Sequence, residues 1–130
     1  MSTLPFQLDL SRPVLLVGTG DAAVAKRRLL ESLHARIDHW SEAPSSAVLH
    51  AATRANEIES TRYALVVVAE LTTWTESILR WARHERLLIN VVDTPDQSDG
   101  FIPAIVSRGA VQIGIGTGGA SPVLARLIRT

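Results

Sequence analysis

The sequence predicts an α/β protein in which a mostly parallel sheet is flanked by helices. Three apolar runs, residues 14–17, 63–69 and 87–92, have the length of strands and carry almost no polar side chain. Strands that are buried on both faces of a parallel sheet have this continuous pattern. Helical stretches separate the runs, which is typical of βαβ units. A chain of 130 residues, 46% of them hydrophobic, has the size and composition of one such domain.

The other elements follow from start and stop signals. A helix is expected to open at residues 44–46, where Pro and Ser residues favour a helix start, and to run to about residue 56. Thr72 or Thr73 can cap a helix over residues 74–85. A second strand is expected at 35–40, a hairpin from 101–107 and 111–116 around Arg108-Gly109, and a last helix from Ser121-Pro122.

The first apolar run leads directly into Gly18-Thr19-Gly20-Asp21-Ala22-Ala23, a Gly-x-Gly-x-x-Ala motif. The first Gly allows a sharp turn, the second leaves room for a pyrophosphate, and the small Ala lets the next helix, residues 22–33, pack on the strand. The amide groups at that helix start favour an anion. We therefore expect a Rossmann-like fold that binds NAD through Gly18, Thr19, Gly20, Asp21 and Ala22. The alternative is a tight strand-to-helix turn without a ligand.

Further cofactor contacts are expected where the later strands reach the same edge of the sheet. An acidic residue near the end of the second strand holds the adenine ribose in such folds, and Asp38 and Glu42 are the candidates. We favour Glu42, with Ala43 beside it, because Asp38 lies inside the strand. No Arg or Lys lies in residues 38–44, so NAD is expected over NADP. His39 is interpreted as a surface residue rather than as a ligand-binding one. The third strand brings Ala69, Glu70 and Thr72 to this edge.

Asp93 directly follows the fourth expected strand, residues 87–92. Side chains at that position of an open α/β sheet face the ligand crevice. A carboxylate there has the right chemistry for a base that takes a proton from a bound substrate. The alternative is an Asp that starts a turn ahead of Pro95.

Composition limits the classes of partner. Lys plus Arg equals Asp plus Glu, at 13 each, so no excess positive charge recruits nucleic acid or an anionic membrane. No apolar run approaches the ~20 residues of a membrane span. The absence of cysteine excludes disulfides, thiolate metal sites and a cysteine nucleophile, and it fits a cytoplasmic location. No metal site is predicted.

Blocks of residues in a fixed order resemble the precorrin-2 dehydrogenase domain of siroheme synthases. They are Leu4-Pro5, Val17–Arg27, Asn90-Val91-Val92-Asp93-x-Pro95, Phe101–Val106 and Gly118-Gly119-Ala120-Ser121-Pro122-Val123-Leu124-Ala125-Arg126. Those enzymes oxidise precorrin-2, a tetrapyrrole, to sirohydrochlorin with NAD, and many also insert ferrous iron to give siroheme. The family usually carries Ala-Ala-Thr followed by acidic residues after its third strand, where this chain has Val68-Ala69-Glu70-Leu71-Thr72.

The resemblance implies a catalytic role for Asp93 and a carboxylate-rich substrate. Residues that can receive its carboxylates are Thr117, Gly118, Gly119, Ser121 and Arg126, although Ser121 equally fits a helix cap. The resemblance also implies that the chain has two parts. Residues 1–116 form the NAD-binding domain with its hairpin, and residues 117–130 form a glycine loop and the truncated start of a helical dimerisation region. A homodimer is expected. The alternatives are an NAD-binding module without catalysis and a regulatory partner of a fuller siroheme synthase.

Overall fold

The structure is a computed structural model that describes residues 2–115. The chain divides into two compact units. One unit is Leu8–Gly100, and the other joins the N-terminal residues up to Gln7 with the segment that begins at Phe101.

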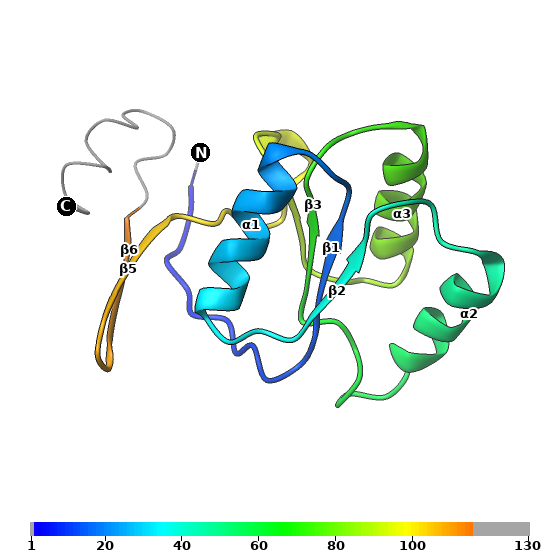
Figure 1. The fold of residues 1–130 in the computed structure, drawn as a ribbon. Helices are drawn as coiled ribbons and strands as arrows, with labels where there is room; N and C mark the ends of the chain where they lie inside the picture. The colour runs from blue at the N-terminus through cyan, green and yellow to red at the C-terminus, as the bar shows by residue number, and fades with distance from the viewer. Residues whose placement is uncertain (1, 116–130) are drawn as a thin grey trace. The chain divides into compact units, whose positions relative to one another are not determined.

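The unit Leu8–Gly100 is a four-stranded parallel sheet with helices on both faces (Figure 1). Its elements are β1 (Val14–Val17), α1 (Asp21–Ser32), β2 (Ile37–Trp40), α2 (Ser46–Ala55), β3 (Leu65–Val68), α3 (Thr73–His84), β4 (Ile89–Val91) and the short 3₁₀ helix η1 (Pro95–Gln97). The predicted α/β fold with a parallel sheet is confirmed.

The core explains why the strands are apolar throughout. Every residue of β1 and β3 is buried, as expected for the central strands of a parallel sheet. Leu15 and Val17 pack with side chains of α2 and α3 on one face, including Ala52 and Ile78. Figure 1 shows α1 on the other face, where Leu30 is buried.

The strand order β2-β1-β3-β4 places β1 and β3 side by side at the centre of the sheet. The chain moves outward from β1 to β2 in one direction and from β3 to β4 in the other. In open α/β sheets, ligands bind at this reversal, beyond the carboxyl ends of the two strands. The fold therefore points to the loops that follow Val17 and Val68.

The predicted element boundaries hold to within a few residues. Ser45 caps α2 by accepting a hydrogen bond from the amide of Val48, and Thr72, rather than Thr73, caps α3. The third strand is shorter than the apolar run that predicted it. Tyr63 and Ala64 are buried, but they precede the residues that pair with β1. The loop predicted for residues 94–100 contains η1.

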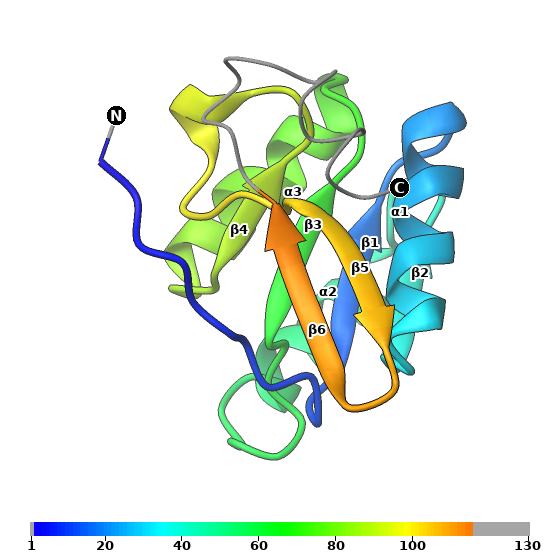
Figure 2. The same ribbon diagram turned by 90° about the vertical axis from the view of Figure 1, so that its left-hand side faces the viewer.

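The second unit contains an antiparallel hairpin of β5 (Ala104–Arg108) and β6 (Val111–Ile115), shown in Figure 2. The predicted hairpin is confirmed, but its turn is one residue further along. Arg108 pairs with Val111, so the turn residues are Gly109 and Ala110, and Gly109 supplies the positive φ of 59°. The final helix predicted from Ser121 lies outside the described residues.

Candidate dinucleotide site

The glycine turn follows β1 at the central reversal of the sheet. Gly18 has φ +109° and Gly20 has φ +94°, which are conformations that favour glycine. A Cβ atom on Gly18 would lie 3.1 Å from Cγ of Glu70, whereas a Cβ atom on Gly20 would meet nothing within 4 Å. The backbone conformation thus favours glycine at position 18, and a side chain there would also press on Glu70. Gly20 is required by the backbone and faces open space that a ligand can enter.

Helix α1 starts immediately after this turn. Gly20 is its N-cap, and no side chain caps the helix start. The first amide groups of α1 therefore remain available to an anion, as in dinucleotide sites. Ala22 is half-buried and Ala23 is 1% exposed, which lets the helix approach the sheet as the motif predicts. These residues fit a dinucleotide. The open space beside Gly20, the left-handed backbone of the turn and the free amide groups of α1 all lie at the junction of β1 and α1.

The end of β3 contacts the turn from one side. The amide of Ala69 donates to the carbonyl of Val17 at 2.8 Å, which aligns the two strand ends. The amide and the hydroxyl of Thr19 both donate to Oε1 of Glu70, each at 3.1 Å. Sequence reasoning placed Ala69 and Glu70 at this edge without predicting that Glu70 bonds to Thr19.

The end of β2 contacts the turn from the other side. Nε2 of His39 lies 2.7 Å from the carbonyl oxygen of Gly18, and the amide of Gly18 donates to the carbonyl of Trp40. His39 is half-buried, so its interpretation as a surface residue is wrong. The register pairs it with Leu16, which turns its side chain toward the α1 face. Residue spacing alone gives no sign of this contact.

The structure distinguishes Asp38 from Glu42, the two residues predicted as candidates for binding the adenine ribose. Asp38 pairs in register with Leu15, and its Oδ2 accepts a hydrogen bond of 2.6 Å from the hydroxyl of Tyr63. Burial of Tyr63, followed by its bond to Asp38, raises the pKa of the tyrosine above its usual range. Asp38 is thus engaged away from the strand end. Glu42 and Ala43 follow β2, are exposed, and remain the predicted contacts.

Thr72 has a structural contact of its own. Its hydroxyl accepts a bond from the amide of Thr75, while its amide donates to the Thr75 hydroxyl at 2.7 Å. This reciprocal capping box fixes the start of α3. A cofactor contact by Thr72 stays a prediction.

Asp93 lies at the carboxyl end of β4, as predicted. It is exposed and has φ +56°, a left-handed conformation that Asp tolerates better than most residues. The amide of Val92 donates to Val68, and the amide of Thr94 donates to Val91. Asp93 therefore sits in a turn and also follows the strand next to β3. These facts are compatible with both the base and the turn-forming alternatives.

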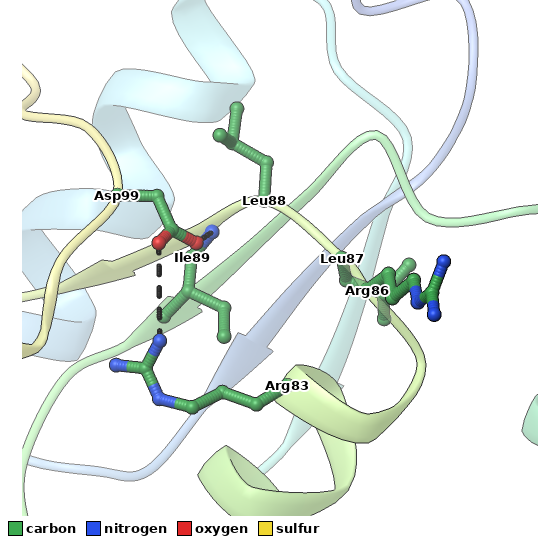
Figure 3. Close-up of a pocket in the computed structure, with 6 residues that line it drawn as sticks. All are labelled: Arg83, Arg86, Leu87, Leu88, Ile89 and Asp99. Carbon is green, nitrogen blue, oxygen red and sulfur yellow. Dashed lines mark hydrogen bonds and ion pairs between the residues drawn. The ribbon is translucent and has the colours of Figure 1, made fainter.

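The structure also has a cavity of about 430 Å³ at the amino end of β4 (Figure 3). It is lined by Arg83, Arg86, Leu87, Leu88, Ile89 and Asp99. Arg83 lies 3.8 Å from Asp99, an ion pair that is exposed on both sides. Because β4 runs from this end toward Asp93, the cavity lies at the edge of the sheet opposite the glycine turn.

Two further observations concern residues 2–115 alone. No group of three or more His, Cys, Asp or Glu side chains there is placed to hold a metal ion. No helix in that part is long and apolar enough to cross a membrane. The predicted substrate contacts lie outside the described residues: Thr117, Gly118, Gly119, Ser121 and Arg126.

Comparison with known proteins gives two family matches. Residues 6–104 match a family described as putative NAD(P)-binding, and residues 108–130 match the central part of sirohaem biosynthesis proteins. The first description confirms the predicted class of cofactor. SirC, a precorrin-2 dehydrogenase of solved structure, has the same fold, with a TM-score of 0.68 and 22% sequence identity. That match covers 98% of this chain and 67% of SirC.

Curated relatives are siroheme synthases. That of Methylococcus capsulatus is 33% identical over 141 residues, covering 100% of this chain and 30% of the relative. That of Nitrosococcus oceani is 32% identical, covering 99% of this chain and 30% of the relative. The chain thus spans about 30% of the length of these enzymes. The matches confirm the resemblance stated from the sequence, and the chain belongs to the family described as putative NAD(P)-binding.

Proposed function

We propose that the chain catalyses the NAD-dependent oxidation of precorrin-2 to sirohydrochlorin. One observation carries the proposal: the glycine turn after β1 and the carboxylate of Asp93 after β4 both lie at the carboxyl edge of one parallel sheet. A nucleotide held at the turn and a base are the two groups that a dehydrogenation needs. The siroheme synthase relatives and the dehydrogenase named SirC support the same reaction.

Each group has a distinct role in this proposal. NAD, when bound, supplies the hydride acceptor. The 18–22 segment orients the dinucleotide through the turn and the start of α1, and Glu42 holds the adenine ribose. Asp93 accepts the proton that leaves the macrocycle. The substrate thereby loses one hydride and one proton, which balances the two-electron oxidation.

The remaining parts of the proposal concern partners and location. We place the carboxylates of precorrin-2 against Thr117, Gly118, Gly119, Ser121 and Arg126. We also propose a homodimer, ferrous iron as a second substrate, and a cytoplasmic location. The absence of cysteine in the 130 residues supports that location.

The proposal is tested by anaerobic incubation of the chain with precorrin-2 and NAD. We expect NADH to appear with a matching loss of precorrin-2, measured by absorbance. Omission of either reactant is the control. NAD binding without turnover would contradict the proposal and would favour the binding-module or regulatory alternative.

The same site predicts a preference between cofactors. NAD is expected to bind about tenfold more tightly than NADP, equivalent to about 1.4 kcal/mol. The reason is that Glu42 would repel a 2′-phosphate, and no Arg or Lys lies in residues 38–44. Isothermal calorimetry at neutral pH measures both affinities, and Glu42→Gln is expected to narrow the difference. Tighter binding of NADP would contradict this assignment.

A further inference from the structure

His39 is the one side chain of β2 that bonds to the glycine turn within the described residues. Its Nε2 atom lies 2.7 Å from the carbonyl oxygen of Gly18. Its other ring nitrogen, Nδ1, lies 3.3 Å from Nη1 of Arg27 on α1. Nε of Arg27 donates to Glu31 at 2.9 Å, so a second contact on α1 holds the guanidinium. The imidazole is therefore held between the turn and the first helix.

These two contacts define one state of the imidazole ring. A carbonyl oxygen accepts hydrogen bonds, so Nε2 must carry a hydrogen. A guanidinium only donates, so Nδ1 must present its lone pair. Both bonds are satisfied together only in the neutral tautomer with hydrogen on Nε2. A protonated ring would set an N–H group against the N–H groups of Arg27.

The bond to Gly18 has a consequence on the other side of the same peptide unit. In a trans peptide, the carbonyl of Gly18 and the amide of Thr19 point in opposite directions. Anchoring the oxygen on His39 therefore aims the Thr19 amide away from β2. That amide faces Oε1 of Glu70 at 3.1 Å, which confirms that an anionic oxygen fits this position. Glycine at position 18 offers little resistance of its own to rotation of this peptide.

We propose that His39, kept in its neutral tautomer by Arg27, is a positioning residue that locks the Gly18–Thr19 peptide so that the Thr19 amide faces the phosphates of the dinucleotide. The ligand in this inference rests on the proposed function. His39 acts through the backbone and makes no contact with the reacting atoms. It occupies the carbonyl of the Gly18–Thr19 peptide, so that a ligand which displaces Glu70 finds the Thr19 amide already in place.

Calorimetric titration with NAD tests the role of His39. His39→Leu removes the donor and is expected to weaken NAD binding by about 3- to 10-fold, the range of one net hydrogen bond. His39→Gln places an amide N–H near the position of Nε2 and is expected to recover most of that loss. His84→Leu is the matched control, because His84 is 88% exposed in the last turn of α3. Circular dichroism checks that each variant is folded.

The outcomes separate this inference from the proposed function. Folded His39→Leu with the NAD affinity of the wild type would overturn the inference. So would a His39→Gln variant as weak as His39→Leu, since loss of packing alone would then explain the effect. Failure of the wild type to bind NAD would instead overturn the proposed function.

Long-range ¹H–¹⁵N spectra of the imidazole give a readout that needs no ligand. We expect the free chain to have hydrogen on Nε2 of His39, and Arg27→Met to relax this preference. Hydrogen on Nδ1 in the wild type would overturn the inference whether or not NAD binds.

Discussion

Asp93→Asn is expected to lower the rate of precorrin-2 oxidation by ~10²–10⁴-fold while NAD still binds, because that is the usual contribution of a general base. Asparagine keeps the size of the side chain and removes its capacity to accept the proton. It also tolerates the left-handed backbone of this position, where φ is +56°. The turn should thus survive the change, and a loss of rate would report chemistry. The measurement is anaerobic NADH formation at saturating NAD.

Asp96→Asn is the matched control for this prediction. Asp96 is an exposed carboxylate in the neighbouring η1, so the two variants change the charge of the same loop equally. Only Asp93→Asn is expected to slow turnover. Near-wild-type turnover in Asp93→Asn would assign Asp93 to the turn alone, since asparagine serves turns about as well as aspartate.

Gly20→Val is expected to weaken NAD binding by about 10- to 100-fold, or about 1.4–2.8 kcal/mol. Gly20 has φ +94° and ψ −174°, a region that is almost exclusive to glycine. Nothing in the free chain lies within 4 Å of a Cβ atom there, so the side chain would fill the space left to the pyrophosphate. Calorimetry with NAD measures the change.

Gly109→Val is the matched control for Gly20→Val. It distinguishes the effect of a blocked cofactor site from the effect of backbone strain alone. Gly109 also has a positive φ, +59°, and open space around it, but it lies in the β5–β6 turn. Both variants are expected to lose stability, by about 1–3 kcal/mol. Only Gly20→Val should change the affinity for NAD. Equal affinity in folded Gly20→Val and in the wild type would remove the turn from the cofactor site.

The fold was predictable because its main signals are local. The apolar runs that form β1, β3 and β4 are continuous in the sequence. Ser45 caps α2 and Thr72 caps α3, in the positions where the sequence places the helix starts. The predicted strand at 63–69 is too long because burial and sheet pairing are different properties. Tyr63 is 7% exposed without belonging to β3.

The detail of the site was less predictable because its contacts join distant parts of the chain. His39 and Gly18 are 21 residues apart, and Thr19 and Glu70 are 51 residues apart. Both bonds depend on the parallel register of three strands and on the orientation of one peptide. The end of the apolar run at residue 69 places Glu70 near the edge of the sheet, but no sequence pattern gives the direction of its carboxylate.

The carboxylate of Glu70 gives the glycine turn a resident anion. Thr19 donates to it with both its amide and its hydroxyl, so these two donors are satisfied before any ligand arrives. A dinucleotide that reaches Thr19 therefore exchanges one anion for another, and its gain at this residue is only the difference between two similar bonds. The remaining affinity must come from groups beyond Thr19, such as the open start of α1. Because a negative group leaves as another enters, added salt should weaken binding less than at a turn that begins without an anion.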